Sequence, residues 1–236
     1  MKKILTIIGR EFKSYFSSPI AYIFIVGFLV ISGLFFGLNL LASKEATLRY
    51  FMGNTIFILI FIIPALTMRL FSEEKKTGTL EILMTLPVRD YEVILGKFLA
   101  SFLFYLLMLF LTFIFPLTLF VIGKPDLGIM ISNYLGLIFF GMALLSIGLY
   151  ASTLTENQIV AFITSLGFIM ILFFIHALKN VFGEALGPIF EYVSLNSHFD
   201  NFSKGLIDSK DVFYYLSMTC IFLFLSLNIL ESRKWK

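Results

Sequence analysis

The hydrophobic pattern of the chain is dominated by six long apolar runs, each close to the roughly 20 residues that a helix needs to cross a bilayer. The runs cover residues 20–41, 51–71, 98–122, 131–153, 159–178 and 212–230. They predict an all-α integral membrane protein with six transmembrane helices, organised as a single membrane domain over residues 1–236. Composition agrees, because 59% hydrophobic and 14% charged residues leave too little polar surface for a soluble protein.

Residues 1–18 precede the first run and have an amphipathic pattern. On a helical wheel, Ile7, Phe12 and Tyr15 belong to an apolar half, and basic residues including Arg10 occupy the other half. This pattern predicts a helix that lies in the membrane interface with its basic face toward the lipid headgroups. Glu11 falls at the edge of the apolar half. Either its side chain snorkels to water, or it forms an ion pair with a basic residue of the first intracellular loop, such as Arg69.

Charge is concentrated between the second and third runs. Ten of the 33 charged residues lie between Arg69 and Lys97. We expect residues 72–92 to form a cytoplasmic loop, since a membrane protein that gathers its charge in one loop offers that loop to a soluble partner.

The middle of this loop predicts a short amphipathic helix of about two turns. Gly78 supplies flexibility, Thr79 is suited to cap the helix, and Glu81 falls in the first turn, where the helix dipole favours an acidic residue. Leu83 belongs to the apolar face, and Pro87 ends the helix. We interpret it as a helix that docks into a groove on a cytosolic partner. The alternative is a solvated loop with a membrane-facing hydrophobic side.

Residues 179–211, between the fifth and sixth runs, mix apolar patches with glycine, proline and asparagine. We expect a re-entrant extracytoplasmic segment of short helices at, or dipping into, the outer leaflet, because backbone at that depth is helical or buried in protein.

The distribution of lysine and arginine predicts the orientation of the chain. With the N-terminus in the cytoplasm, inside segments hold 12 basic residues and outside segments hold 6. The positive-inside rule therefore favours cytoplasmic N- and C-termini.

Several function classes lack support in the sequence. There is no P-loop for ATP, no basic cluster for nucleic acid, and no acidic or basic residue in the middle of a span for a proton relay. The lone Cys220 excludes an internal disulfide. His176 and His198 are interpreted as interfacial or surface histidines; the competing interpretation is a zinc-binding or basic pair. We therefore predict no catalytic residue, cofactor or metal in this chain.

Two prolines lie inside predicted spans, and each is expected to kink its helix. Pro64 lies in the second span, directly above the charged loop, and is a candidate hinge. Pro116 lies in the third span.

The acidic start Glu73-Glu74, followed by Thr77-Gly78-Thr79-Leu80-Glu81-Ile82-Leu83 and then Pro87, resembles the loop of ABC-2-type transporter permeases. Arg10-Glu11-Phe12 followed by Ser18-Pro19 is also similar to that family, as are the six spans and the large outer segment. Within the family, residues 197–215 are most similar to the permease subunits associated with gliding motility.

The resemblance implies an ABC-transporter permease subunit that couples ATP hydrolysis by a separate ATPase subunit to export across the bacterial inner membrane. The implied partners are a cytosolic ATPase dimer that binds ATP and Mg²⁺, a second permease copy, membrane lipids and a companion with a periplasmic domain. The implied coupling residues are Glu73, Glu74, Thr77, Gly78, Thr79, Glu81, Leu83 and Pro87. Two alternatives remain: a complex that transmits force without moving cargo, and a channel or scaffold without an ATPase.

Overall fold

The six predicted spans are confirmed in the computed structural model, which describes residues 2–43, 49–81, 88–123 and 125–232. All of the regular structure in these residues is helical. The spans are formed by α2 (Pro19–Ser43), α3 with α4 (Arg49–Thr67 and Arg69–Lys76), α6 with α7 (Asp90–Leu111 and Ile114–Ile122), α8 (Leu127–Leu154), α9 with the 3₁₀ turn η1 (Gln158–Phe174 and Ile175–Leu178) and α12 (Ser209–Ser232). Three further helices are α1 (Lys2–Ser17), α10 (Lys179–Val193) and α11 (Leu195–Ser203).

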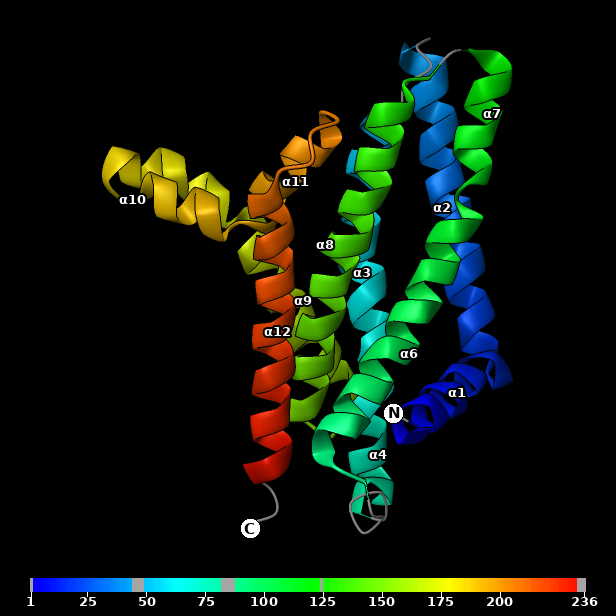
Figure 1. Ribbon diagram of the computed structural model, residues 1–236, viewed down its shortest axis with the longest axis vertical. Coiled ribbons are helices and arrows are strands. Elements are labelled where there is room, and N and C mark those ends of the chain that lie inside the picture. The colour runs from blue at the N-terminus through cyan, green and yellow to red at the C-terminus, as the bar shows by residue number, and fades with distance from the viewer. Residues whose placement is uncertain (1, 44–48, 82–87, 124, 233–236) are drawn as a thin grey trace.

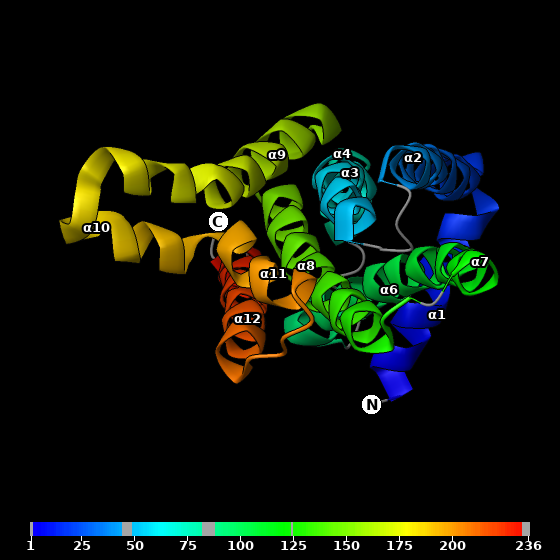
Figure 2. The ribbon, with the colours of Figure 1, turned by 90° about the horizontal axis from the view of Figure 1, so that it is seen from above.

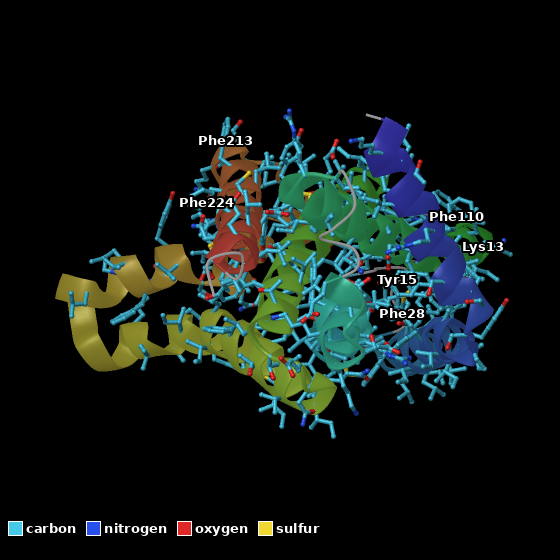
Figure 3. The ribbon with its side chains drawn as sticks, turned by 90° about the horizontal axis from the view of Figure 1, so that it is seen from below. Lys13, Tyr15, Phe28, Phe110, Phe213 and Phe224 are labelled. Carbon is cyan, nitrogen blue, oxygen red and sulfur yellow. The ribbon has the colours of Figure 1, made fainter. Side chains whose placement is uncertain are left out.

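The spans stand side by side in two rows. Seen from above, α9, α3 and α2 form one row, and α12, α8 and α6 form the other (Figure 2). The central helix α8 contacts α12, α9, α3 and α6, and it is the most buried span. The spans α2, α9 and α12 expose most of their apolar surface, as helices that face lipid or a second protein do. Phe213 and Phe224 lie on the outer side of α12, and Phe110 lies on the outer side of α6 (Figure 3).

Helix α1 crosses one end of the bundle, where α4 and the last turn of α12 also lie (Figure 1). We call this the α1 end. The apolar side of α1 packs on α6. A Cβ on Gly96 would lie only 2.6 Å from Cγ2 of Ile7, so this glycine permits the close approach. Further along, Tyr15 stacks on Phe104 and its hydroxyl lies 3.0 Å from Oγ of Ser101. The amphipathic helix predicted for residues 1–18 is therefore confirmed; its place in the membrane interface stays a prediction.

The third span is broken at Thr112, and Pro116 explains the break. Proline has no N–H to donate to the carbonyl four residues earlier, and its ring pushes that carbonyl away. The freed Thr112 carbonyl instead accepts from the hydroxyl of Tyr134 on α8, at 3.2 Å, and from the N–H of Phe115, at 3.0 Å. Helix α6 thus ends at Leu111 and α7 begins at Ile114. The predicted kink at Pro116 is confirmed.

The second span is interrupted at Met68, four residues after Pro64. A hydroxyl from α8 enters the helix at this point: Oγ of Ser152 accepts from the N–H of Phe71 at 2.9 Å and of Ser72 at 3.1 Å, and donates to the Met68 carbonyl at 3.2 Å. A side chain inserted into the hydrogen-bond ladder is a recognised cause of helix breaks. The interruption near Pro64 was expected, but its position is set by Ser152.

Helix α10 projects sideways from the bundle and folds back on itself (Figures 1 and 2). Lys179 at its start and Glu191 near its end form an ion pair at 2.6 Å. A straight helix would place these residues about 18 Å apart, beyond the reach of the two side chains. The predicted short helices of residues 179–211 are present as α10 and α11.

The prediction of a surface position is wrong for His198. Its ring is almost fully buried, stacks on Tyr214 at 3.9 Å, and contacts Oδ1 of Asp211 at 2.6 Å and the Tyr192 carbonyl at 2.8 Å. Asp211 is itself fully buried and accepts from Nδ2 of Asn201 at 2.8 Å. Helix α11 packs against α12, and this contact buries His198 of α11 together with Asp211 of α12.

Candidate functional site

The charged segment after the second span begins as a helix rather than as a loop. We predicted a loop from residue 72, but α4 continues the span to Lys76. Glu73 and Glu74 therefore project from a helix that extends past the apolar part of the span. Glu73 pairs with Arg69 one turn earlier, at 2.9 Å.

Lys97 joins three helices at the α1 end. Its Nζ lies 2.8 Å from Oε1 of Glu74 on α4 and 3.3 Å from Oε1 of Glu11 on α1. Arg10 contacts the same two carboxylates, at 2.7 Å from Glu11 and 3.6 Å from Glu74. We call Arg10, Glu11, Glu74 and Lys97 the charge cluster. Since Glu11 pairs with Arg10 and Lys97, and Arg69 pairs with Glu73, the suggested Glu11–Arg69 pair is wrong.

Within the charge cluster, the electrostatic attraction is strongest at Lys97, because that side chain is only 1% exposed and water screens it little. Its Nζ also lies 5.2 Å from the ring centroid of Phe71, within the range of a cation–π contact. Burial alone would raise the pKa of Glu11, but the charge of Lys97 and the hydrogen bond from Arg10 together hold that pKa below its ordinary value. The hydrogen bond to Glu11 raises the pKa of Arg10 in turn. Both pKa shifts favour the ionised forms of Arg10 and Glu11.

A tight turn follows α4. Gly78 has a φ of +70°, a left-handed conformation that costs a residue with a side chain roughly 1–2 kcal/mol. The hydroxyls of Thr77 and Thr79 lie 2.9 Å apart across this turn, and the backbone is helical again over residues 79–81. Glu81 is exposed and Leu80 is buried. The start of the predicted short helix is thus present, whereas Leu83 and Pro87 lie outside the described residues.

The chain re-enters the bundle at α6, where the Arg89 N–H donates to Oε2 of Glu92 at 2.9 Å. On the other side of the site, Nζ of Lys75 donates to the Thr153 carbonyl at the end of α8. This contact and the Ser152 hydroxyl fix both ends of α4 to the central helix. The charged turn therefore follows directly after α4, a helix that contacts α1, α6 and α8.

A cavity of about 570 Å³ opens beside the charge cluster, between α1, α2, α4 and α6. One wall is polar and includes Arg10, Arg69 and Glu73, and the opposite wall is apolar and includes Phe24 and Leu66. Tyr15 points from α1 into this region of the bundle, while Lys13 points outward (Figure 3). Phe12 packs against Phe16 and the apolar core, as expected for the apolar face of α1.

Three residues that contribute to this site are not predicted from the sequence: Lys97, Lys75 and Ser152. Lys97 carries a weak signal, since a lysine seven residues into an apolar helix needs a partner. Ser152 carries none, because serine is ordinary in a membrane helix. Among the described residues, no group of three or more His, Cys, Asp and Glu side chains is arranged to hold a metal ion.

Comparison with known proteins gives one family. A family model described as ABC-2 family transporter protein matches residues 41–235. The matched segment includes five of the six spans, the charged turn and the folded-back α10, and leaves out α1. None of the curated proteins matches the chain.

Proposed function

Because the match covers most of its length, this chain belongs to the ABC-2 family of transporter proteins, and we propose on that premise that it couples ATP hydrolysis to export. It is a multi-pass membrane subunit of an ABC transporter. In the proposed mechanism a separate ATPase subunit binds ATP and Mg²⁺, and this chain supplies the transmembrane helices. The coupling residues are Glu73, Glu74, Thr77, Gly78, Thr79, Glu81, Leu83 and Pro87.

The observation that carries the proposal is the attachment of α4 to three other helices. A movement of the turn at Gly78 acts on α4, and α4 is linked to α1 and α6 through Glu74 and Lys97 and to α8 through Lys75 and Ser152. A push by a soluble partner on this turn is therefore delivered to spans two, three and four together. An isolated flexible loop would not transmit it.

The same proposal includes the assembly and its location. Two permease copies bind a cytosolic ATPase dimer, with the exposed faces of α2 and α9 available for the contact between copies. The α1 end faces the cytoplasm of a bacterial inner membrane, which agrees with the positive-inside count. We further propose, from the likeness of residues 197–215, that the chain is of the type associated with gliding motility, and that a companion with a periplasmic domain joins the complex.

The test is co-purification of this chain with the ABC ATPase whose gene lies nearest to its own gene. Wild type is compared with Gly78→Pro and Glu81→Ala. Gly78 donates its N–H to the Lys75 carbonyl at 3.2 Å, and proline abolishes both this bond and the φ of +70°. Gly205→Pro is the matched control, since Gly205 has a φ of +85° and donates to the Phe202 carbonyl at 3.0 Å at the other end of the bundle.

Loss of the ATPase in Gly78→Pro and Glu81→Ala, with retention in Gly205→Pro, is the expected result. Equal retention in all four proteins would place the docking site elsewhere. If wild type binds no ATPase, the channel or scaffold alternative replaces the transporter. If the complex forms and hydrolyses ATP but moves no compound in vesicles, the force-transmitting alternative replaces export.

A further inference from the structure

The cavity beside the charge cluster has a divided lining. Its apolar wall is built by Ile20, Ala21 and Phe24 at the start of α2, and by Leu66 and Leu70 at the end of the second span. These residues belong to helices that are long and apolar enough to cross a membrane. The polar wall comes from α1, α4 and the start of α6, which lie at the α1 end (Figure 1). The occupant that fits is itself amphipathic, with its polar part toward the α1 end.

The charges in the polar wall sum to zero. Three basic side chains, Arg10, Arg69 and Lys97, face three acidic ones, Glu11, Glu73 and Glu74. Lys97 is buried, whereas Arg10, Arg69 and Glu73 are partly exposed and accessible to a ligand. A wall that offers both signs in equal number fits a zwitterion better than an anion, because an anion would meet three carboxylates.

One carboxylate oxygen of the wall lacks a hydrogen-bond donor. Both oxygens of Glu73 accept from Arg69, and Oε1 of Glu74 accepts from Lys97, but Oε2 of Glu74 is buried and has no partner among the described residues. A buried acceptor without a donor costs about 1–3 kcal/mol. Glu73, whose side chain is 44% exposed, is the carboxylate that a ligand with N–H donors can reach. In the same wall, the Arg10 contacts use Nη2, which leaves further N–H groups of this guanidinium for a phosphate oxygen.

We propose that this cavity binds the headgroup of a zwitterionic aminophospholipid such as phosphatidylethanolamine. The phosphate lies at Arg10, the primary ammonium lies at the carboxylates of Glu73 and Glu74, and an acyl chain runs along Phe24 and Leu66. Phosphatidylcholine lacks the N–H donors, and phosphatidylglycerol lacks the cation. Inorganic phosphate lacks the part that covers the apolar wall. The site goes beyond the proposed function, because it requires no ATPase and no transported compound.

The experiment is native mass spectrometry of the purified chain after exchange against micelles that contain equal amounts of phosphatidylethanolamine, phosphatidylcholine and phosphatidylglycerol. Wild type is expected to retain phosphatidylethanolamine in preference to the other two. Glu73→Gln is expected to weaken phosphatidylethanolamine binding about tenfold, the equivalent of one charge-assisted hydrogen bond, and to weaken phosphatidylcholine binding less, because choline is also a cation but has no N–H to donate. Arg10→Gln is expected to weaken both, since the two lipids share the phosphate.

Glu191→Gln is the matched control, because Glu191 is also a partly exposed carboxylate in an ion pair, with Lys179 on α10. It is expected to bind all three lipids as wild type does. Inorganic phosphate added in excess should displace no lipid. Equal retention of the three lipids, a preference for phosphatidylglycerol, or unchanged phosphatidylethanolamine binding in Glu73→Gln would overturn the proposal. So would a Glu73→Gln protein that loses the ATPase but retains the lipid, since the wall would then serve a protein contact.

Discussion

Nζ of Lys97 lies 2.8 Å from Oε1 of Glu74, although the two residues belong to different spans and are 23 positions apart. The contact joins the end of the second span to the start of the third across the turn that the ATPase is proposed to bind. Lys97 also reaches Glu11 on α1, so one ammonium group holds three helices. Lys97 is therefore a buried cation shared by the three helices that meet at the α1 end.

Replacing Lys97 should destabilise the protein more than replacing either carboxylate. Lys97→Met leaves Glu11 and Glu74 with the half-exposed Arg10 as their shared counter-charge, and removing the buried partner of an ion pair costs about 3–5 kcal/mol. Glu74→Gln leaves Lys97 with Glu11 as its counter-charge and should cost clearly less. Unfolding by SDS in mixed micelles measures both. A smaller loss for Lys97→Met than for Glu74→Gln would contradict the central position of the lysine.

Stability should fall at acidic pH through Glu11. The pKa of this carboxyl is held below its ordinary value of 4.5 in the folded protein, so the ionised form stabilises the fold. This contribution is complete above about pH 4.5 and is lost as the pH falls through the lowered folded value. The melting temperature of wild type should therefore decrease more steeply in this acidic window than that of Glu11→Gln. Parallel curves for the two proteins would show that Glu11 does not contribute.

The apolar runs predict the spans well because burial in lipid demands about 20 apolar residues whatever the neighbouring helices are. The same argument fails at helix ends. Glu73 and Glu74 look like a loop in the sequence, but α4 keeps them helical because Arg69 and Lys97 neutralise them and Ser152 fixes the start of the helix. Helix length beyond the membrane is thus set by partners that the local sequence does not contain.

The candidate site is predictable only in part for a related reason. Gly78 and Thr79 predict a flexible residue before a helix start, and the structure gives Gly78 the positive φ that a glycine tolerates. The partner of Glu11 depends instead on how α1 crosses α6. Gly96, which lets Ile7 approach, determines that Lys97 rather than Arg69 meets the carboxylate. No pattern within residues 1–18 contains this information.

The break in the second span should depend on the hydroxyl of Ser152. Ser152→Ala removes the acceptor of the Phe71 and Ser72 N–H groups, and buried donors without a partner cost about 1–3 kcal/mol. Ser146→Ala is the control, since Ser146 is a buried serine of the same helix that bonds only within its own turn, to the Ala143 carbonyl. In SDS titrations Ser152→Ala should lower the free energy of unfolding more than Ser146→Ala does. Equal losses would mean that the inserted hydroxyl contributes nothing specific.

The buried pair of His198 and Asp211 gives a sharper prediction, because substitutions can preserve or remove its hydrogen bonds. Nε2 of His198 faces the Tyr192 carbonyl, which only accepts, so this nitrogen carries a proton. The carboxylate of Asp211 also only accepts, so Nδ1 donates to it, and Asp211→Asn cannot satisfy both partners: with the amide oxygen toward Nδ1, the amide N–H₂ faces the N–H₂ of Asn201.

Asp211→Asn, which leaves one donor without an acceptor, should therefore cost about 1–3 kcal/mol in the free energy of unfolding, and Asp211→Leu, which leaves Nδ1 and the Asn201 amide unpaired, should cost more, about 2–5 kcal/mol. The two variants are compared by SDS titration at neutral pH. Wild-type stability in Asp211→Asn would show that the contact between the two helices does not depend on the carboxylate. A mild loss in both variants would instead show that the stacking of His198 on Tyr214 at 3.9 Å holds α11 against α12 without the polar contacts.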